Sequence, residues 1–139
     1  MITDRENRFS AAQAVTIGTQ YSTNCYDTAD GSSIGDGEEV WLVVSVGAAF
    51  TGGTSLTVNY VESDNADLSS PSVLVSSGAI AEASLTAGAG ILRLRVPSNS
   101  KRYIGLQFVS VGTHTAGTIN ANLVRDADTN RKYAFENGR

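Results

Sequence analysis

Cysteine, histidine and proline are scarce in this chain. Of its 139 residues, one is cysteine, one is histidine and two are proline. Cys25 has no partner for an intramolecular disulfide, and together with His114 it supplies too few ligands for a zinc site. The longest apolar runs, such as 40–44, are too short to cross a bilayer, and the first residues lack the apolar core of a secretory signal. We therefore expect a soluble protein made in the cytosol, without a membrane partner and held together by packing and association.

Motifs for catalysis and cofactor binding are also missing. His114 lies in Gly-Thr-His-Thr, which reads as an exposed turn, and neither a Gly-x-Ser-x-Gly motif nor any support for a Cys25–His114 pair is present. The acids fall in predicted loops, so we expect neither an enzyme nor a bound cofactor. Two acidic loops, 27–31 and 64–67, offer oxygen ligands but do not match an EF-hand. We predict no metal site and leave calcium binding by these loops open.

Basic residues are absent from a long stretch of the sequence. Neither lysine nor arginine occurs between residues 10 and 92, whereas eight of the ten basic residues follow residue 92. Eight of the ten are arginines, the cation that is enriched at protein interfaces. The sequence pI of about 4.8 argues against binding to nucleic acid. The pattern favours a protein partner that meets the basic part of the chain, although both sets of charges mingling on one surface is the alternative.

Alternation of apolar and polar residues with a period of two runs through the chain and predicts β-strands. In the segment 91–96, Leu92 and Leu94 are expected to face inward, with Arg93 and Arg95 facing outward. The segment 39–46 is apolar on both faces around Trp41, as expected of a strand that is buried on two sides or lies under another subunit. Of these, we expect Trp41 to lie in the core. Strands are predicted at 39–46, 54–63, 91–96, 104–108 and 119–123, and less strongly at 14–17, 21–26, 73–76 and 79–85.

Many short strands separated by glycine-rich turns indicate an all-β, antiparallel β-sandwich that is jelly-roll-like. We expect one such domain at residues 13–125. The polar ends, 1–12 and 126–139, are expected to be extended N- and C-terminal arms, and whether they are ordered before assembly is left open.

Four segments, in this order, resemble a family of capsid cement proteins from short-tailed phages. They are Asp-Arg-Glu-Asn-Arg-Phe-Ser-Ala-Ala-Gln-Ala-Val-Thr at 4–16, Glu-Ser-Asp-Asn-Ala-Asp-Leu-Ser-Ser-Pro at 62–71, Leu-Arg-Leu-Arg-Val-Pro at 92–97 followed by Lys-Arg-Tyr-Ile-Gly-Leu at 101–106, and Ala-Asn-Leu-Val-Arg-Asp at 121–126 with Tyr133. The resemblance spans almost the whole chain.

The resemblance implies a non-enzymatic capsid decoration protein on the exterior of the virion. Its partners would be the major capsid protein and itself, as a homodimer more readily than a trimer; the symmetry axis and the capsid residues contacted are left open. We expect the capsid or subunit interface to include Arg5, Arg8, Phe9, Arg93, Arg95, Lys101, Arg102, Arg131, Tyr133 and Phe135. The alternative is a small carbohydrate-binding module of a phage fibre or secreted protein, which needs a flat platform of exposed aromatic residues.

Overall fold

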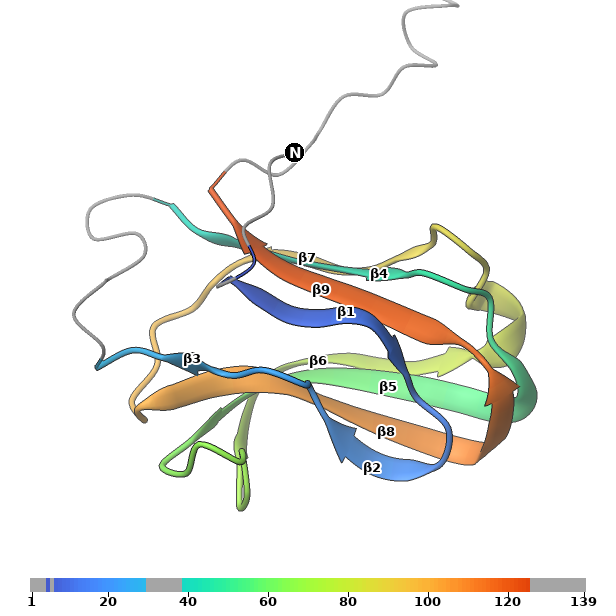
Figure 1. The fold of residues 1–139 in the computed structure, drawn as a ribbon, viewed down its shortest axis with the longest axis horizontal. Helices are drawn as coiled ribbons and strands as arrows, with labels where there is room; N and C mark the ends of the chain where they lie inside the picture. Colours follow the sequence, from blue (N-terminus) through green and yellow to red (C-terminus); the bar gives the residue numbers. More distant parts are fainter. Residues whose placement is uncertain (1–4, 6, 30–38, 126–139) are drawn as a thin grey trace, which may run out of the picture.

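The computed structural model describes residues 5, 7–29 and 39–125, and this part of the chain folds into two antiparallel β-sheets (Figure 1). Sheet A has the strand order β1-β9-β4-β7 and sheet B the order β2-β8-β5-β6, with the short β3 paired to β8. The predicted all-β sandwich is confirmed. The strands are β1 Arg8–Ala14, β2 Gly18–Tyr21, β3 Tyr26–Asp27, β4 Trp41–Val46, β5 Thr51–Ser63, β6 Ser72–Ala81, β7 Gly90–Arg95, β8 Tyr103–Ala116 and β9 Thr118–Val124.

The core fills the space between the two sheets. Sheet A contributes side chains at alternate positions, because successive residues of a strand point to opposite faces. On β4, for example, Leu42, Val44 and Val46 are buried, whereas the residues between them are partly exposed. Sheet B contributes Leu56, Val58, Tyr60, Leu106 and Phe108 from its two central strands.

Most connections carry the chain from one sheet to the other. The steps from β1 to β2, β4 to β5, β6 to β7 and β8 to β9 all leave one sheet and enter the other. The described helical structure is a single 3-10 turn, Glu82–Ser84, between β6 and β7. Because neighbours in sequence lie in different sheets, residues distant in sequence become neighbours on each outer face.

Strands β6 and β8 are longer than the sequence predicts. The predicted strand 73–76 and the first part of the predicted strand 79–85 form one strand, β6, which continues through a bulge at Gly78, where φ is +70°. The predicted strand 79–85 is wrong beyond Ala81, because Glu82–Ser84 form the 3-10 turn. The ladder survives this irregularity because the hydroxyl of Ser77 accepts the backbone N–H of Val58 at 2.9 Å. The predicted turn at Gly112 is likewise wrong: Gly112 lies inside β8 and pairs with Gly53 of β5.

The N-terminal boundary differs from the expected arm at residues 1–12. Strand β1 begins at Arg8 and pairs with β9, so residues 8–12 belong to sheet A. Phe9 is 1% exposed and is part of the core, so the expectation that its side chain serves an interface is wrong. The sequence around Phe9 is ambiguous, because an isolated aromatic residue in a polar segment fits a terminal arm and an edge strand equally well. The expected C-terminal arm, 126–139, lies outside the described residues.

Candidate interaction face

The outer face of sheet A brings together arginines that are far apart in the sequence. Cross-strand pairing aligns Arg8 of β1, Asn122 of β9, Val43 of β4 and Arg93 of β7 in one row. A second row contains Val124, Trp41 and Arg95. Residues opposite each other in an antiparallel ladder point to the same side, so both rows lie on the face away from the core. We call this surface the arginine face; it comprises Arg8, Trp41, Val43, Arg93, Arg95, Asn122 and Val124, of which Val124 is only 3% exposed.

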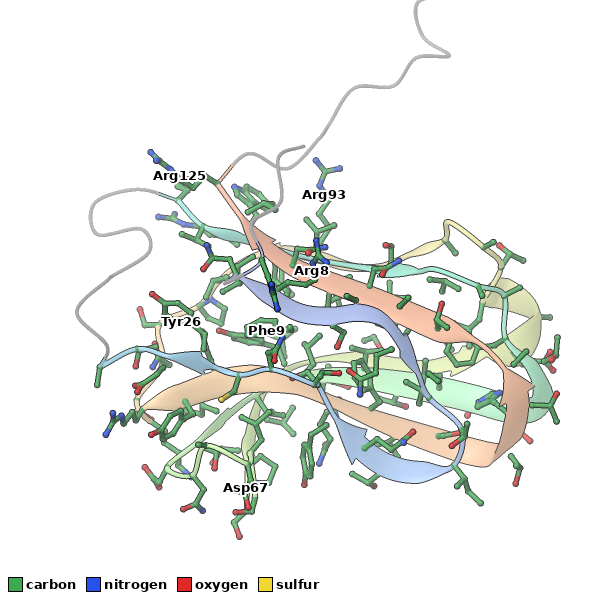
Figure 2. All side chains as sticks on the ribbon, viewed as in Figure 1. Arg8, Phe9, Tyr26, Asp67, Arg93 and Arg125 are labelled. Carbon is green, nitrogen blue, oxygen red and sulfur yellow. The ribbon has the colours of Figure 1, made fainter. Side chains whose placement is uncertain are left out.

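The orientation of strand β7 confirms the prediction from the sequence. Arg93 and Arg95 are exposed and point outward, and the adjacent Leu92 and Leu94 pack against the core. Figure 2 shows Arg93 projecting away from the sandwich on the sheet A side, with Arg8 and Arg125 on the same side. Arg125, which the sequence did not single out, directly follows β9 and is exposed.

Trp41 lies on the arginine face and not in the core, which corrects the expectation from the sequence. Its neighbours Leu42 and Val44 occupy the inward positions of β4, so the alternation places Trp41 and Val43 on the outer face, each partly exposed. An apolar centre flanked by arginines is typical of a protein interface. The prediction for Trp41 failed because β4 is apolar on both faces. That pattern does not distinguish a residue in the core from one on an apolar outer surface.

Two polar features of the arginine face affect its chemistry. Arg95 forms an ion pair with Glu39 at 3.3 Å, and both side chains are more than half exposed, so the pair adds little to stability. The side-chain oxygen of Asn122 is buried and has no hydrogen-bond partner among the described residues. Such an oxygen carries a desolvation penalty.

Lys101 and Arg102 lie apart from the arginine face, just before β8 of sheet B. Arg102 donates two hydrogen bonds of 2.8 Å to the carboxylate of Asp27 and lies over the ring of Tyr103. Lys101 lies 3.7 Å from the carboxylate of Asp64. These two cations are therefore engaged within the chain. Arg5 is exposed, whereas Arg131, Tyr133 and Phe135 lie outside the described residues.

His114 and Cys25, the two residues considered for catalysis, each lie in surroundings that do not activate them. His114, expected in an exposed turn, is 1% exposed inside β8, where its ring packs edge-on against Phe50. Burial raises the pKa of the Cys25 thiol, and the sulfur lies 3.1 Å from the carbonyl oxygen of Ala66, which it can donate to. A neutral thiol is a poor nucleophile.

Carboxylates of both acidic loops form hydrogen bonds within the chain. The carboxylate of Asp27 binds Arg102, and that of Asp67 accepts the backbone N–H of Ser69 at 2.9 Å. A shallow polar pocket beside the second loop is lined by Ser22, Thr23, Asn24, Cys25, Ala66, Asp67 and Leu68. Among the described residues, no three histidine, cysteine or acidic side chains are grouped as a metal site would need.

Comparisons with known proteins identify the family of the chain. No helix in the described ranges is long and apolar enough to span a membrane. No curated protein matches the chain. A family model described as Bbp16 matches residues 9–123, which include both sheets almost completely and all the residues of the arginine face except Arg8 and Val124. This match covers well over half of the sequence, and the chain therefore belongs to the Bbp16 family.

Proposed function

We propose that this protein is a non-enzymatic cement protein that binds the exterior of a tailed-phage capsid and holds neighbouring major capsid proteins together. The observation that carries the proposal is the convergence of Arg8, Arg93 and Arg95 around Trp41 and Val43 on one outer sheet face. The resemblance of the four sequence segments to cement proteins of short-tailed phages supports the same function. The protein would be made in the host cytoplasm and reside on the exterior of the virion.

The fold supports this proposal. We infer a jelly-roll-like arrangement from the strand orders β1-β9-β4-β7 and β2-β8-β5-β6. With the short β3 set aside, each connection other than the one from β5 to β6 changes sheets. A rigid sandwich presents two broad outer faces with fixed side-chain positions. Such a face can contact a folded partner without large ordering costs, because its backbone is already fixed.

Binding of the purified protein to capsids that lack it tests the proposal. Saturable co-sedimentation at an icosahedral copy number, together with a higher capsid melting temperature, is expected. A double variant, Arg8→Ala with Arg93→Ala, should weaken capsid binding by roughly tenfold or more, as expected when central interface arginines are truncated.

A matched control is the double variant Lys101→Ala with Arg102→Ala. It removes the same charge from cations that are already engaged with Asp64 and Asp27. Each variant is first checked for a native circular dichroism spectrum. Folded wild-type protein that does not bind capsids at low or moderate salt would overturn the proposed function. Equal loss of binding in both double variants would show that the arginine face is not the capsid contact.

Trp41 favours a second candidate, a carbohydrate-binding module. A partly exposed tryptophan on a sheet face, with Asn122 and Asn120 on the same face, offers a sugar platform of one aromatic residue. A glycan array separates the two candidates. The carbohydrate-binding module would be favoured if the protein does not bind capsids but binds glycans, and if Trp41→Ala abolishes the glycan binding.

A further inference from the structure

Strand β7 is the end strand of sheet A, and its outer edge is regular enough to accept another strand. Its ladder with β4 runs without a shift from the Trp41–Arg95 pair to the Val44–Leu92 pair, and the one irregularity lies beyond Val44, toward Gly90. Among the described residues, no further strand pairs with β7. A regular end strand presents backbone N–H and C=O groups as a template for a partner strand.

The hydrogen bonds of this ladder determine which residues of β7 face the outer edge. The backbone N–H of Val96 donates to the carbonyl oxygen of Val40 at 2.9 Å. Opposite pairs in an antiparallel ladder alternate between bonded and non-bonded, so Leu94 is the next residue of β7 that is bonded to β4. The backbone N–H and C=O groups of Arg93 and Arg95 therefore point away from β4, toward the outer edge.

The other edges of the sandwich are covered or irregular. At the opposite edge of sheet A, β1 has two register shifts against β9, and the backbone N–H of Asn24 donates to the carbonyl oxygen of Phe9 at 3.0 Å. In sheet B, β2 has four residues, β3 has two, and β6 has two register shifts against β5 and a bulge at Gly78. Short or bulged edges resist the addition of a strand. In the described part of the chain, β7 is thus the edge that suits a partner best.

The side chains of β7 determine what kind of strand would fit. Arg93 and Arg95 are exposed on the arginine face, whereas Leu92 and Leu94 lie on the other side of the strand, where they pack against the core and are only partly buried. Opposite residues on adjacent strands have Cβ atoms about 4.5–5.5 Å apart, close enough for an arginine to bind a carboxylate. An added strand with acidic residues on one side and apolar residues on the other would pair with the arginines and cover the leucines.

We propose that the outer edge of β7 pairs with an extended segment of the partner in which acidic and apolar residues alternate. The inference deepens the proposed function and rests on it for the identity of the partner, a capsid subunit. Backbone hydrogen bonds would hold the segment, and the side chains of β7 would select its sequence. The same edge of a second copy fits poorly, because an antiparallel pair of two such edges brings arginines close together, and like charges opposite each other are destabilising.

Binding of a synthetic peptide tests the inference without capsids. The probe is Thr-Glu-Val-Glu-Val-Thr with both termini blocked, added up to about 5 mM because a short strand that must be ordered binds weakly. It should shift the backbone amide resonances of Arg93 and Arg95 in the folded protein. The matched peptide with lysine in place of each glutamate should not. No shift with the glutamate peptide, or equal shifts with both peptides, would overturn the inference.

Proline at position 95 separates the backbone contact from the charge. Arg95→Thr removes the guanidinium and keeps the backbone N–H, whereas Arg95→Pro removes both. The lost N–H points away from β4, so the ladder within sheet A is kept. Arg95→Pro should bind capsids about two- to tenfold more weakly than Arg95→Thr, the range that corresponds to one lost hydrogen bond. Native circular dichroism is required of both variants.

The outcomes for the inference and for the proposed function are distinct. Equal capsid binding by folded Arg95→Pro and Arg95→Thr would overturn the strand pairing and leave the cement function in place. Peptide-induced shifts at β7 in a protein that does not bind capsids would overturn the proposed function and leave β7 as an edge that accepts an acidic strand. If Arg95→Pro does not fold, the peptide experiment on the wild type decides alone.

Discussion

The carboxylate of Glu62 accepts two hydrogen bonds from Ser100, one from its backbone N–H at 2.6 Å and one from its hydroxyl at 2.8 Å. A third bond, at 3.2 Å, comes from the backbone N–H of Lys101. Glu62 lies on β5 of sheet B, and Ser100 lies in the segment that leads from β7 of sheet A to β8 of sheet B. The buried carboxylate thus fixes a crossover between the two sheets, and it holds in place the chain that follows the strand bearing Arg93 and Arg95.

Replacement of Glu62 by alanine is expected to lower the free energy of unfolding by about 1–3 kcal/mol, because it leaves backbone donors at a partly buried site without an acceptor. Chemical denaturation measures the change. Asp64→Asn is the matched control: this carboxylate is exposed and only 3.7 Å from Lys101, so its loss should change stability by less than about 1 kcal/mol. Equal effects of the two substitutions would contradict the role of Glu62 as a clamp.

Stability is expected to fall in acid. The hydrogen bond from the backbone N–H of Ser100 is the main reason that the pKa of Glu62 lies below its ordinary value. Hydrogen bonding by the guanidinium of Arg102 likewise lowers the pKa of Asp27. The unfolded chain, whose carboxyls titrate at about pH 4, then binds more protons than the folded chain in the window below that pH. The contribution of both groups is therefore complete above about pH 5 and is lost as the pH falls through the folded pKa values.

Denaturant titrations at several pH values measure this dependence. Glu62→Gln, which has no carboxyl to protonate, should show a shallower loss of stability between about pH 5 and pH 3 than the wild type. Identical slopes for the two proteins would show that Glu62 does not contribute to the acid sensitivity.

Gly53 is required by close packing against His114. A Cβ atom at residue 53 would overlap the imidazole ring, which is buried against Phe50. Gly53→Ala should therefore destabilise by about 1–3 kcal/mol, the usual cost of overpacking a core. Gly90→Ala is the control, since a Cβ there meets no atom within 4 Å and its φ is not positive. A stability loss in Gly90→Ala as large as in Gly53→Ala would contradict the packing argument.

The sequence predicts the sandwich and the orientation of its regular strands well, because period-two alternation records burial on one face. It fails where a strand departs from that period. Gly112 resembles a turn residue, yet it pairs with Gly53 inside a long ribbon of β5 and β8. At that point the register shifts, and His114 turns into the core. Local composition alone does not distinguish such a bulge from a turn.

The candidate site was predictable in part. Alternation identifies Arg93 and Arg95 as outward residues, but their neighbours on the face depend on which strands pair. Arg8 joins them only because β1 pairs with β9 and β9 with β4. Lys101 and Arg102, close to Arg95 in sequence, are instead drawn into ion pairs at the start of β8. Long-range strand order, which no local pattern specifies, decides both outcomes.

Among the described residues, Tyr60 is the largest fully buried side chain, and its hydroxyl has no hydrogen-bond partner there. Burial, with a smaller contribution from the charge of Glu62, raises the pKa of Tyr60 well above its ordinary value. An unsatisfied buried hydroxyl costs about 1–3 kcal/mol, so Tyr60→Phe is expected to raise the free energy of unfolding by up to that amount. Tyr21→Phe, at a half-exposed tyrosine, should change stability little.

Alkaline titration gives a second readout of the same environment. In the folded wild type the tyrosinate absorbance should lack the contribution of Tyr60 until the protein unfolds, since ionisation would place an unpaired charge in the core. The folded Tyr60→Phe variant should then titrate like the wild type below the unfolding transition. A variant that is less stable than the wild type by more than about 1 kcal/mol would mean that the hydroxyl does have a partner, such as a buried water. In that case the centre of the sandwich holds a polar contact, and Tyr60 is retained for that contact and not for its volume alone.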